Sequence, residues 1–504
     1  MKAKRSIYNF IFSNLSLIIS FALGIIIPRL FIISLGSEAN GLISSIGQIF
    51  SYVGLLEAGI GATVTQALYK PIVNNDRTQI NRILSASNRY YKKIGTIYIA
   101  CVFVLAAVYP LVVDTKLPLW QVIAVVCFTG LGNAVNFLLQ QNYVVLLSAE
   151  GKGYITTNLN TVVNVLSSLA KVVLLIIGFN IVYIVGAQFV ITLLRILLLR
   201  IYIGRGYRWL DLKQEPDKSA LSKQRYVMVQ QLSYFVFTNT DIVILTFFCN
   251  LTVVSIYTVY NMIIGVIEGV VGTFTSSVVF AMGQLYNDDF NKFKRIYKIY
   301  DSCYMTLVFA LFSVVYLCII PFLSVYTRGF DQSGYLDPLL ALLFVVLKMV
   351  TTLRAQSQNA INFAGHFKET QKSSVVEMVM NIVISLVAVY FIGIYGVVIG
   401  SIVSTLYKGI SVTNYANKII LKENAKERRV KYIRWVVYIF TFLIICLVSK
   451  NVVPTAVNNY YQCFLIAVIC TVISLTTYFI LWMISDWNMS KDAFKLAKDI
   501  LFKK

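Results

Sequence analysis

Charged side chains are scarce in this chain, and acidic ones are the scarcest. Only 13% of its 504 residues are charged, and 22 Asp and Glu stand against 44 Lys and Arg. An ordinary soluble domain has about 25% charged residues, whereas here 58% of the residues are hydrophobic and the mean hydropathy is +0.74. This composition excludes an ordinary soluble globular protein and indicates a membrane protein.

Sequence motifs of common enzymes and metal proteins are missing as well. The eight cysteines show no C-x-x-C spacing, so neither a disulfide framework nor a zinc site is indicated. The single histidine, His366, is interpreted as an interfacial residue without a function. No G-x-x-x-x-G-K-S/T phosphate loop occurs, which excludes an ATPase within this chain. We expect no cofactor. Any transport by such a chain would depend on H⁺, on Na⁺ or on the membrane potential rather than on ATP.

Fourteen apolar stretches follow one another along the chain. A helix rises about 1.5 Å per residue, so a hydrocarbon core about 30 Å thick needs about 20 apolar residues. The stretches lie roughly at 8–34, 41–68, 94–113, 119–147, 155–178, 181–203, 227–248, 253–284, 300–323, 337–365, 374–393, 395–417, 434–450 and 461–485. Their outer connectors are too short for a folded outer domain, which argues against a membrane glycosyltransferase or polymerase.

The net charge of +22 does not indicate nucleic acid, because Lys and Arg collect in every second connector. Such alternation is the positive-inside pattern of multi-pass membrane proteins. We therefore expect both termini to be cytoplasmic. The last segment, 486–504, has apolar residues on one helical face and lysines elsewhere, so it is expected to lie on the anionic membrane surface.

A short pattern occurs twice, which predicts an internal repeat. Glu57-Ala-Gly-Ile-Gly61 precedes Asp76 and a basic amphipathic stretch, and Glu268-Gly-Val-Val-Gly272 precedes Asp288 and a similar stretch. Six spans separate the copies, so both have the same orientation. We predict an all-α membrane protein with about 14 transmembrane helices in two parallel-repeat lobes around a central cavity. Its parts are an N-lobe (1–204), a cytoplasmic linker (205–225), a C-lobe (226–420), two further spans (421–485) and the amphipathic tail (486–504).

Polar side chains form stripes along three of the apolar stretches. They recur at steps of three and four residues, the spacing of one helical face. Polar and charged residues inside a membrane face a water-filled cavity or one another. The stripes are Asn133, Asn136 and Gln140; Asn160, Asn164, Ser167 and Lys171; and Lys348, Thr351, Arg354, Gln358 and Asn362. We predict that all three line a shared cavity.

A further cation, Arg29, follows Pro28 in the first stretch. Its planar guanidinium could bind a phosphate through two hydrogen bonds. The alternative is that it reaches the outer interface. With Lys171, Lys348 and Arg354, it makes four candidate substrate-binding cations for the cavity.

Three acids lie at membrane depth: Glu57, Asp241 and Glu268. Each could pair with a cation, couple transport to Na⁺ or H⁺, or satisfy a neighbouring helix. Arg195 and Lys408 lie near the cytoplasmic ends of their stretches, where long side chains reach the headgroups. We leave both, and Glu377, out of the site. Four cations against three acids favour an anionic cargo, whose exit from a negative interior is downhill by about 2.3 kcal/mol per charge per 100 mV.

Several segments match the motifs of a known family. They are Pro28-Arg-Leu-Phe-Ile-Ile-Ser-Leu-Gly36, Asn40-Gly-Leu42, Leu55-Leu-Glu-Ala-Gly-Ile-Gly61, Leu68-Tyr-Lys-Pro71, Asn239-Thr-Asp-Ile-Val-Ile244, Ser255-Ile-Tyr-Thr-Val-Tyr-Asn261 and Ile320-Pro-Phe-Leu323. They resemble the bacterial oligosaccharide flippases (O-antigen and capsule repeat-unit translocases) of the multidrug/oligosaccharidyl-lipid/polysaccharide (MOP) exporter superfamily. Among the four cations, Arg29 matches the family pattern best.

The resemblance implies a non-enzymatic flippase in the bacterial plasma membrane. Its cargo would be an undecaprenyl-diphosphate-linked oligosaccharide, moved by alternating access for O-antigen, capsule or exopolysaccharide assembly. Polysaccharide polymerase and assembly proteins would be its partners. A lipid II flippase and a cation-coupled drug exporter of the same superfamily are the alternatives, and a membrane glycosyltransferase or polymerase is a distant one. A drug exporter is expected to have acidic rather than basic side chains facing its cargo, so the four cations argue against it.

Overall fold

Helices make up nearly all of the chain that the structure describes. The computed structural model describes residues 23–57, 60–217, 224–332, 334–485, 487 and 489–493, and no strand occurs in these ranges. Eleven of the described helices are long and apolar enough to cross a membrane, and Leu23–Leu35 and Phe235–Phe248 are shorter apolar helices. The chain is therefore a multi-pass membrane protein. The predicted count of about 14 spans is not reached by this criterion, and most of the expected tail lies outside the described residues.

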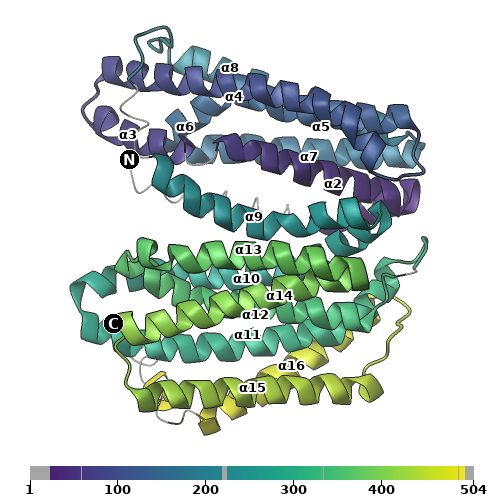
Figure 1. Ribbon diagram of the computed structural model, residues 1–504, viewed down its shortest axis with the longest axis vertical. Coiled ribbons are helices and arrows are strands. Elements are labelled where there is room, and N and C mark those ends of the chain that lie inside the picture. Colours follow the sequence, from purple (N-terminus) through teal and green to yellow (C-terminus); the bar gives the residue numbers. More distant parts are fainter. Residues whose placement is uncertain are drawn as a thin grey trace. The chain divides into compact units, whose positions relative to one another are not determined.

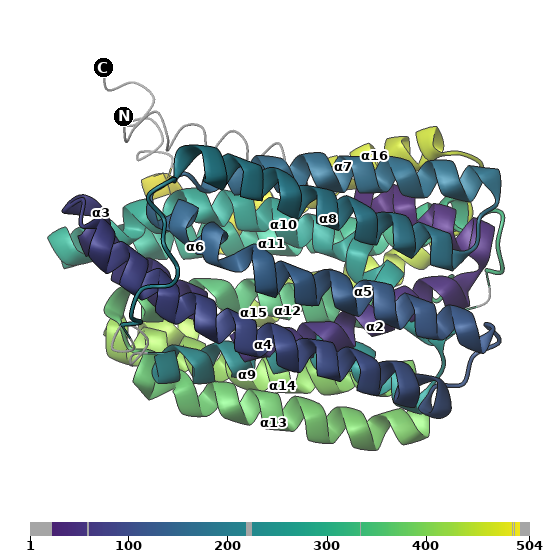
Figure 2. The ribbon, with the colours of Figure 1, turned by 90° about the horizontal axis from the view of Figure 1, so that it is seen from above.

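The chain packs as two compact units, residues 1–258 and 259–504. The first contains α2 (Ser37–Gly54), η1 (Leu55–Glu57), α3 (Ile60–Val73), α4 (Arg77–Val112), α5 (Leu119–Leu139), α6 (Gln141–Ala149), α7 (Gly153–Ile177), α8 (Ile181–Gly206) and α9 (Gln224–Phe248). Within it, α4 and α5 lie side by side, as do α7 and α8 (Figure 2). This unit includes α9, which packs on α2. The predicted lobe limits stay a prediction.

The second unit begins inside α10 (Leu251–Asp288). It continues with α11 (Phe290–Tyr326), α12 (Pro338–Ala364), α13 (Phe367–Ile392), α14 (Ile394–Tyr415), η3 (Ala416–Ile420), α15 (Ala425–Val452) and α16 (Tyr460–Ser485). The pair α13 and α14 forms an antiparallel hairpin (Figure 1). A Cβ atom at Gly396 would lie 2.3 Å from the carbonyl carbon of Ala388, and one at Gly400 would lie 2.4 Å from Ser385 Oγ. Glycine therefore permits the close approach of these two helices.

Two predicted spans are interrupted in the structure. The span expected at 41–68 is divided into α2, the 3₁₀ helix η1 and α3. The span expected at 119–147 is divided into α5 and α6 at Gln140, where φ is −117° and ψ is −39°. The first break lies in a glycine-containing segment, and glycine favours helix poorly. No glycine or proline marks the second, so the sequence prediction of one continuous span was wrong there.

The basic stretches that follow the two repeated patterns begin two very long helices. The Asp76 side chain accepts a hydrogen bond from Gln79 N at 2.9 Å and caps α4, which has 36 residues. Asp289 caps the 37-residue α11 in the same way, through Lys292 N at 3.0 Å. Such helices are about 55 Å long, so each extends well beyond a hydrocarbon core. The matching cap and length agree with a parallel repeat, although the second cap is Asp289 rather than Asp288.

Candidate functional site

A cavity of about 370 Å³ lies between α2, α5, α7 and α8 in the first unit. Its polar lining includes Asn133, Asn136, Asn164, Ser167, Gln188 and Arg195. The structure thus brings together polar residues from the stripes of the fourth and fifth predicted spans. The third stripe belongs to the second unit.

Arg195, on α8, is the charged residue in this lining. Its Nη1 donates to Asn160 Oδ1 at 3.1 Å and its Nη2 donates to Asn136 Oδ1 at 3.2 Å. No described carboxylate lies within ion-pair distance, and Nε has no hydrogen-bond partner among the described residues. The expectation that Arg195 reaches the headgroups was therefore wrong. The guanidinium is half-buried, and it joins the stripes of α5 and α7.

Other predicted residues of the first unit lie apart from this cavity. Gln140 is 4% exposed at the junction of α5 and α6. Lys171 is half-buried on α7, outside the lining, and forms no ion pair with a described residue. Arg29 is half-buried in the helix Leu23–Leu35 and is likewise outside the lining. A role for these three in binding stays a prediction.

The acid Glu57 connects the two interrupted helices of the first unit. Its Oε1 accepts a hydrogen bond from Tyr91 Oη on α4 at 3.3 Å and a short one from Gln141 Nε2, at the first residue of α6. The described donors to Glu57 are thus neutral groups of neighbouring helices. Asp241, on α9, is 5% exposed and accepts from Tyr257 Oη at 2.8 Å. Coupling of either acid to Na⁺ or H⁺ stays a prediction.

Two of the four predicted cations have acidic partners in the second unit. Lys348 Nζ on α12 lies 2.9 Å from Glu268 Oε2 on α10. Arg354, also on α12, forms an ion pair with Glu377 on α13, and both side chains are largely buried. The predicted balance of four cations against three acids does not include Glu377. It therefore overstates the positive charge of this stripe that is not paired with an acid. Gln358 donates to Asn362 Oδ1 at 3.1 Å.

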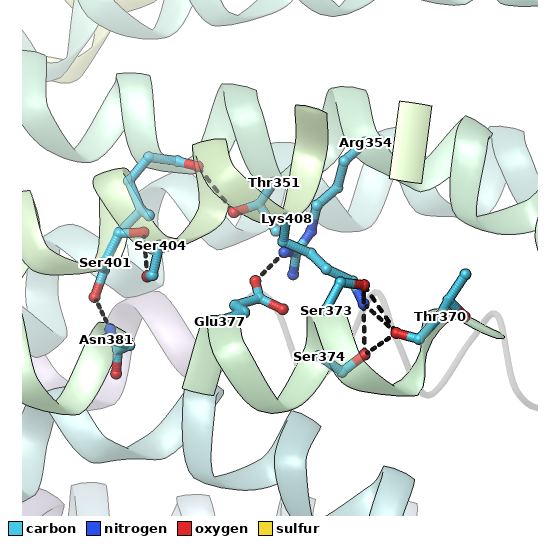
Figure 3. A network of polar contacts seen from close by, with 11 residues as sticks. Thr351, Arg354, Thr370, Ser373, Ser374, Glu377, Asn381, Ser401, Ser404 and Lys408 are labelled. Carbon is cyan, nitrogen blue, oxygen red and sulfur yellow. Dashed lines mark hydrogen bonds and ion pairs between the residues drawn. The ribbon is translucent and has the colours of Figure 1, made fainter. Parts of the chain in front are cut away.

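Lys408, on α14, is 4% exposed, so the expectation that it reaches the headgroups was also wrong. Its ammonium donates to Thr370 O at 3.4 Å, to Ser373 Oγ at 3.1 Å and, over a short distance, to Ser374 Oγ. All three acceptors lie in the first turns of α13. Figure 3 shows that the Arg354 and Lys408 side chains both extend to this helix, where Glu377 also lies.

The signal that would have identified these residues is the stripe pattern itself. On α8, Gln188, Thr192 and Arg195 follow one another at steps of four and three, and all three line the cavity. On α14, Ser401, Ser404 and Lys408 show the same spacing. Helical spacing therefore identifies Arg195 and Lys408 as members of polar stripes, which their position near the end of a span does not.

Comparison with known proteins supports the fold and leaves the cargo open. No protein-family model and no curated protein matches the chain. A lipid II flippase MurJ in its inward closed conformation superposes with a TM-score of 0.70 at 12% identity, covering 94% of this chain and 99% of the other. An inward-facing MATE family transporter of the MOP superfamily superposes with a TM-score of 0.65 at 15% identity, covering 80% and 96%. These likenesses confirm the predicted all-helical fold class, and both proteins are transporters.

Proposed function

We propose that this chain is a flippase for an anionic, lipid-linked oligosaccharide. It would move undecaprenyl-diphosphate-linked repeat units from the cytoplasmic to the outer leaflet of a bacterial plasma membrane, for surface polysaccharide assembly. The fold, which a lipid II flippase and a MATE transporter share, supports a transport role. The observation that favours an anion is Arg195 in its polar cavity without a described carboxylate partner.

The cavity chemistry suits a phosphorylated sugar. A half-buried guanidinium without an acid gains most from an anion, because desolvated charge is costly unless it is paired. Arg is also the side chain whose geometry best matches two phosphate oxygens. The carboxamides of Asn133, Asn136 and Asn164 can both donate and accept hydrogen bonds, as sugar hydroxyls require. A volume of about 370 Å³ falls within the range of about 300–1,000 Å³ typical of small-molecule sites.

The proposed transport cycle involves no covalent chemistry. Cations neutralise the diphosphate while the polyprenyl chain stays in lipid, and rearrangement of the protein exposes the headgroup to the other side. The membrane potential assists the outward movement of negative charge. Coupling to H⁺ or Na⁺ through Glu57 or Asp241 is part of the proposal, as is cooperation with a polysaccharide polymerase.

Lipid II is the second candidate cargo, because the lipid II flippase covers 94% of this chain. It is also a polyprenyl diphosphate, so the same cation would serve it. The two candidate cargoes predict different effects of deleting the gene. Deletion should remove a surface glycan if the cargo is an oligosaccharide repeat unit, and should stop cell-wall synthesis if the cargo is lipid II.

Flipping in proteoliposomes tests the proposal directly. A fluorescent undecaprenyl-diphosphate oligosaccharide is placed in one leaflet, and its appearance in the other is followed with a membrane-impermeant quencher. We expect Arg195→Gln to slow flipping at least about tenfold, the lower part of the effect of losing a charged hydrogen bond. The matched control is Arg200→Gln, because Arg200 is exposed on the same helix and does not line the cavity. Equal rates in the two variants would refute the assignment.

A further inference from the structure

Three ionisable side chains from three helices meet in the second unit. Arg354 comes from α12, Glu377 from α13 and Lys408 from α14 (Figure 3). Arg354 and Glu377 are in direct contact, and Lys408 interacts electrostatically with the same carboxylate. Two cations therefore share one acid. With ordinary ionisation the cluster has one excess positive charge in a largely buried position.

The other ion-paired acids of this unit already have cations of their own. Glu268 pairs with Lys348, Asp301 with Lys431, Glu427 with Lys298, and Asp492 with Arg295. Each of these pairs has one cation for one acid within ion-pair distance. The Arg354–Glu377 pair differs from them in burial, because the Glu377 side chain is 7% exposed and the other four acids are 22–41% exposed. One further anion would balance the second cation beside Glu377.

Lys408 is held so that it can accept Glu377 as a partner. Its ammonium is bound by the hydroxyls of Ser373 and Ser374, which precede Glu377 on α13 by four and three residues. Residues at this spacing lie on one helical face with Cβ atoms about 5–6 Å apart. A change of side-chain rotamer would move the carboxylate from Arg354 to Lys408. Hydroxyl groups can rotate between donating and accepting, so the serines can adapt to this exchange.

We propose that the anionic headgroup of the cargo, an organic diphosphate, displaces Glu377 from Arg354, and that Lys408 then takes Glu377 as its partner. This rests on the proposed function and specifies how the second unit binds the diphosphate. Arg354 is the binding cation, Glu377 is its competitor in the unloaded state, and Lys408 is the positioning residue that receives the competitor.

The exchange also changes which helices are joined. In the unloaded state Glu377 ties α13 to α12, whereas Lys408 ties α13 to α14. After the exchange Glu377 pairs within the α13–α14 hairpin, whose two helices are already closely packed through Gly396 and Gly400. Cargo binding would therefore release α12 from α13 while the α13–α14 hairpin stays intact.

Binding of farnesyl diphosphate to the purified full-length protein, measured by calorimetry, tests the exchange. We expect Arg354→Gln to weaken binding and Glu377→Gln to tighten it at least about fivefold, the lower end of typical coupling between two sites. Lys408→Gln should weaken binding by a similar factor, because Glu377 then stays on Arg354. The decisive variant is the double change Lys408→Gln with Glu377→Gln, which should bind as tightly as Glu377→Gln alone.

Controls separate this exchange from a structural role and from the proposed function. Glu427→Gln removes a carboxylate from a lysine pair near the start of α15, and it should bind farnesyl diphosphate as the unaltered protein does. Lys408→Arg keeps the charge and should bind normally. If Glu377→Gln weakens binding, or if the double variant binds no better than Lys408→Gln, the exchange is refuted while the flippase assignment stands. If the unaltered protein binds no farnesyl diphosphate and flips no labelled lipid, both are refuted. Should Lys408→Gln fail to fold, the sign of the Glu377→Gln effect still decides.

Discussion

Placing an acid beside Arg195 should block an anionic cargo without removing the arginine. Thr192 precedes Arg195 by one turn of α8 and lines the same cavity. Its hydroxyl donates to Gln188 O at 2.9 Å within the helix, so little else depends on it. Residues at this spacing lie with Cβ atoms about 5–6 Å apart. A glutamate introduced by Thr192→Glu can therefore reach the guanidinium and form an ion pair with it.

The size of the effect follows from the charges. Two unit charges about 4 Å apart interact by about 4 kcal/mol at an effective dielectric constant of about 20. Water in the open part of the cavity screens part of this energy. We expect that about 1.4 to 2.8 kcal/mol of cargo binding is lost, which corresponds to about a 10- to 100-fold weaker affinity.

The assay is the proteoliposome flipping measurement with substrate titration, and Thr192→Gln is the matched control. The glutamine variant has the same size and no charge, so it isolates the effect of the carboxylate. If the cargo is anionic, Thr192→Glu should slow flipping and Thr192→Gln should not. A cationic drug as cargo predicts the opposite sign. Equal rates for the glutamate and glutamine variants would show that Arg195 does not act on the cargo by charge.

Three further changes test other parts of the structure. Replacing both Arg29 and Lys348 by Ala should stop surface polysaccharide export in cells and leave membrane insertion intact, as export and membrane-fraction blots would show. Gly400→Ala should lower the thermal unfolding midpoint in detergent, because a Cβ there lies 2.4 Å from a side-chain oxygen of α13 and overpacking costs about 1–3 kcal/mol. Tyr91→Phe removes one of two donors to Glu57, so it should destabilise the first unit by about 1–2 kcal/mol in the same measurement.

The two stability changes each have a control in the same chain. Gly204→Ala adds a methyl group to α8 where nothing lies within 4 Å, so the unfolding midpoint should not fall. Tyr202→Phe removes a hydroxyl from an exposed tyrosine of the same helix and should be neutral. Normal export by the Arg29 and Lys348 double variant would remove both residues from the candidate substrate-binding cations. An unchanged midpoint for Gly400→Ala would mean that α13 and α14 can move apart without a loss of stability.

The fold class followed from the sequence because membrane helices satisfy their own backbone groups. Apolar length therefore located most helices without knowledge of their neighbours. The break at Gln140 could not be found in this way, because neither glycine nor proline marks it. Likewise, the ends of α4 and α11 extend well past any hydrocarbon core, so hydropathy described only part of each helix.

The candidate site was predicted less completely, for a different physical reason. A stripe predicts that residues share one face of one helix, and Asn133, Asn136 and Asn164 do line one cavity. A stripe does not specify which helix faces it. The pairing of Arg354 with Glu377, 23 residues later, depends on how α12 and α13 pack. The same is true of Lys408, whose oxygen partners all come from a neighbouring helix.

The proposal of an anionic cargo therefore depends on Arg195 in the first unit and on Lys408 beside Arg354 in the second. Lys348 and Arg354 have acids beside them, whereas Arg195 and Lys408 have no described carboxylate within ion-pair distance. The sequence places Arg195 and Lys408 near the ends of their spans, a position that predicts contact with the headgroups. One belongs to each unit, and each is bound by neutral oxygen atoms, which hold a cation without cancelling its charge. A cation held in this way keeps its charge. At Arg195 that charge is available to a phosphate, and at Lys408 it is available to Glu377 once the cargo has displaced this acid from Arg354.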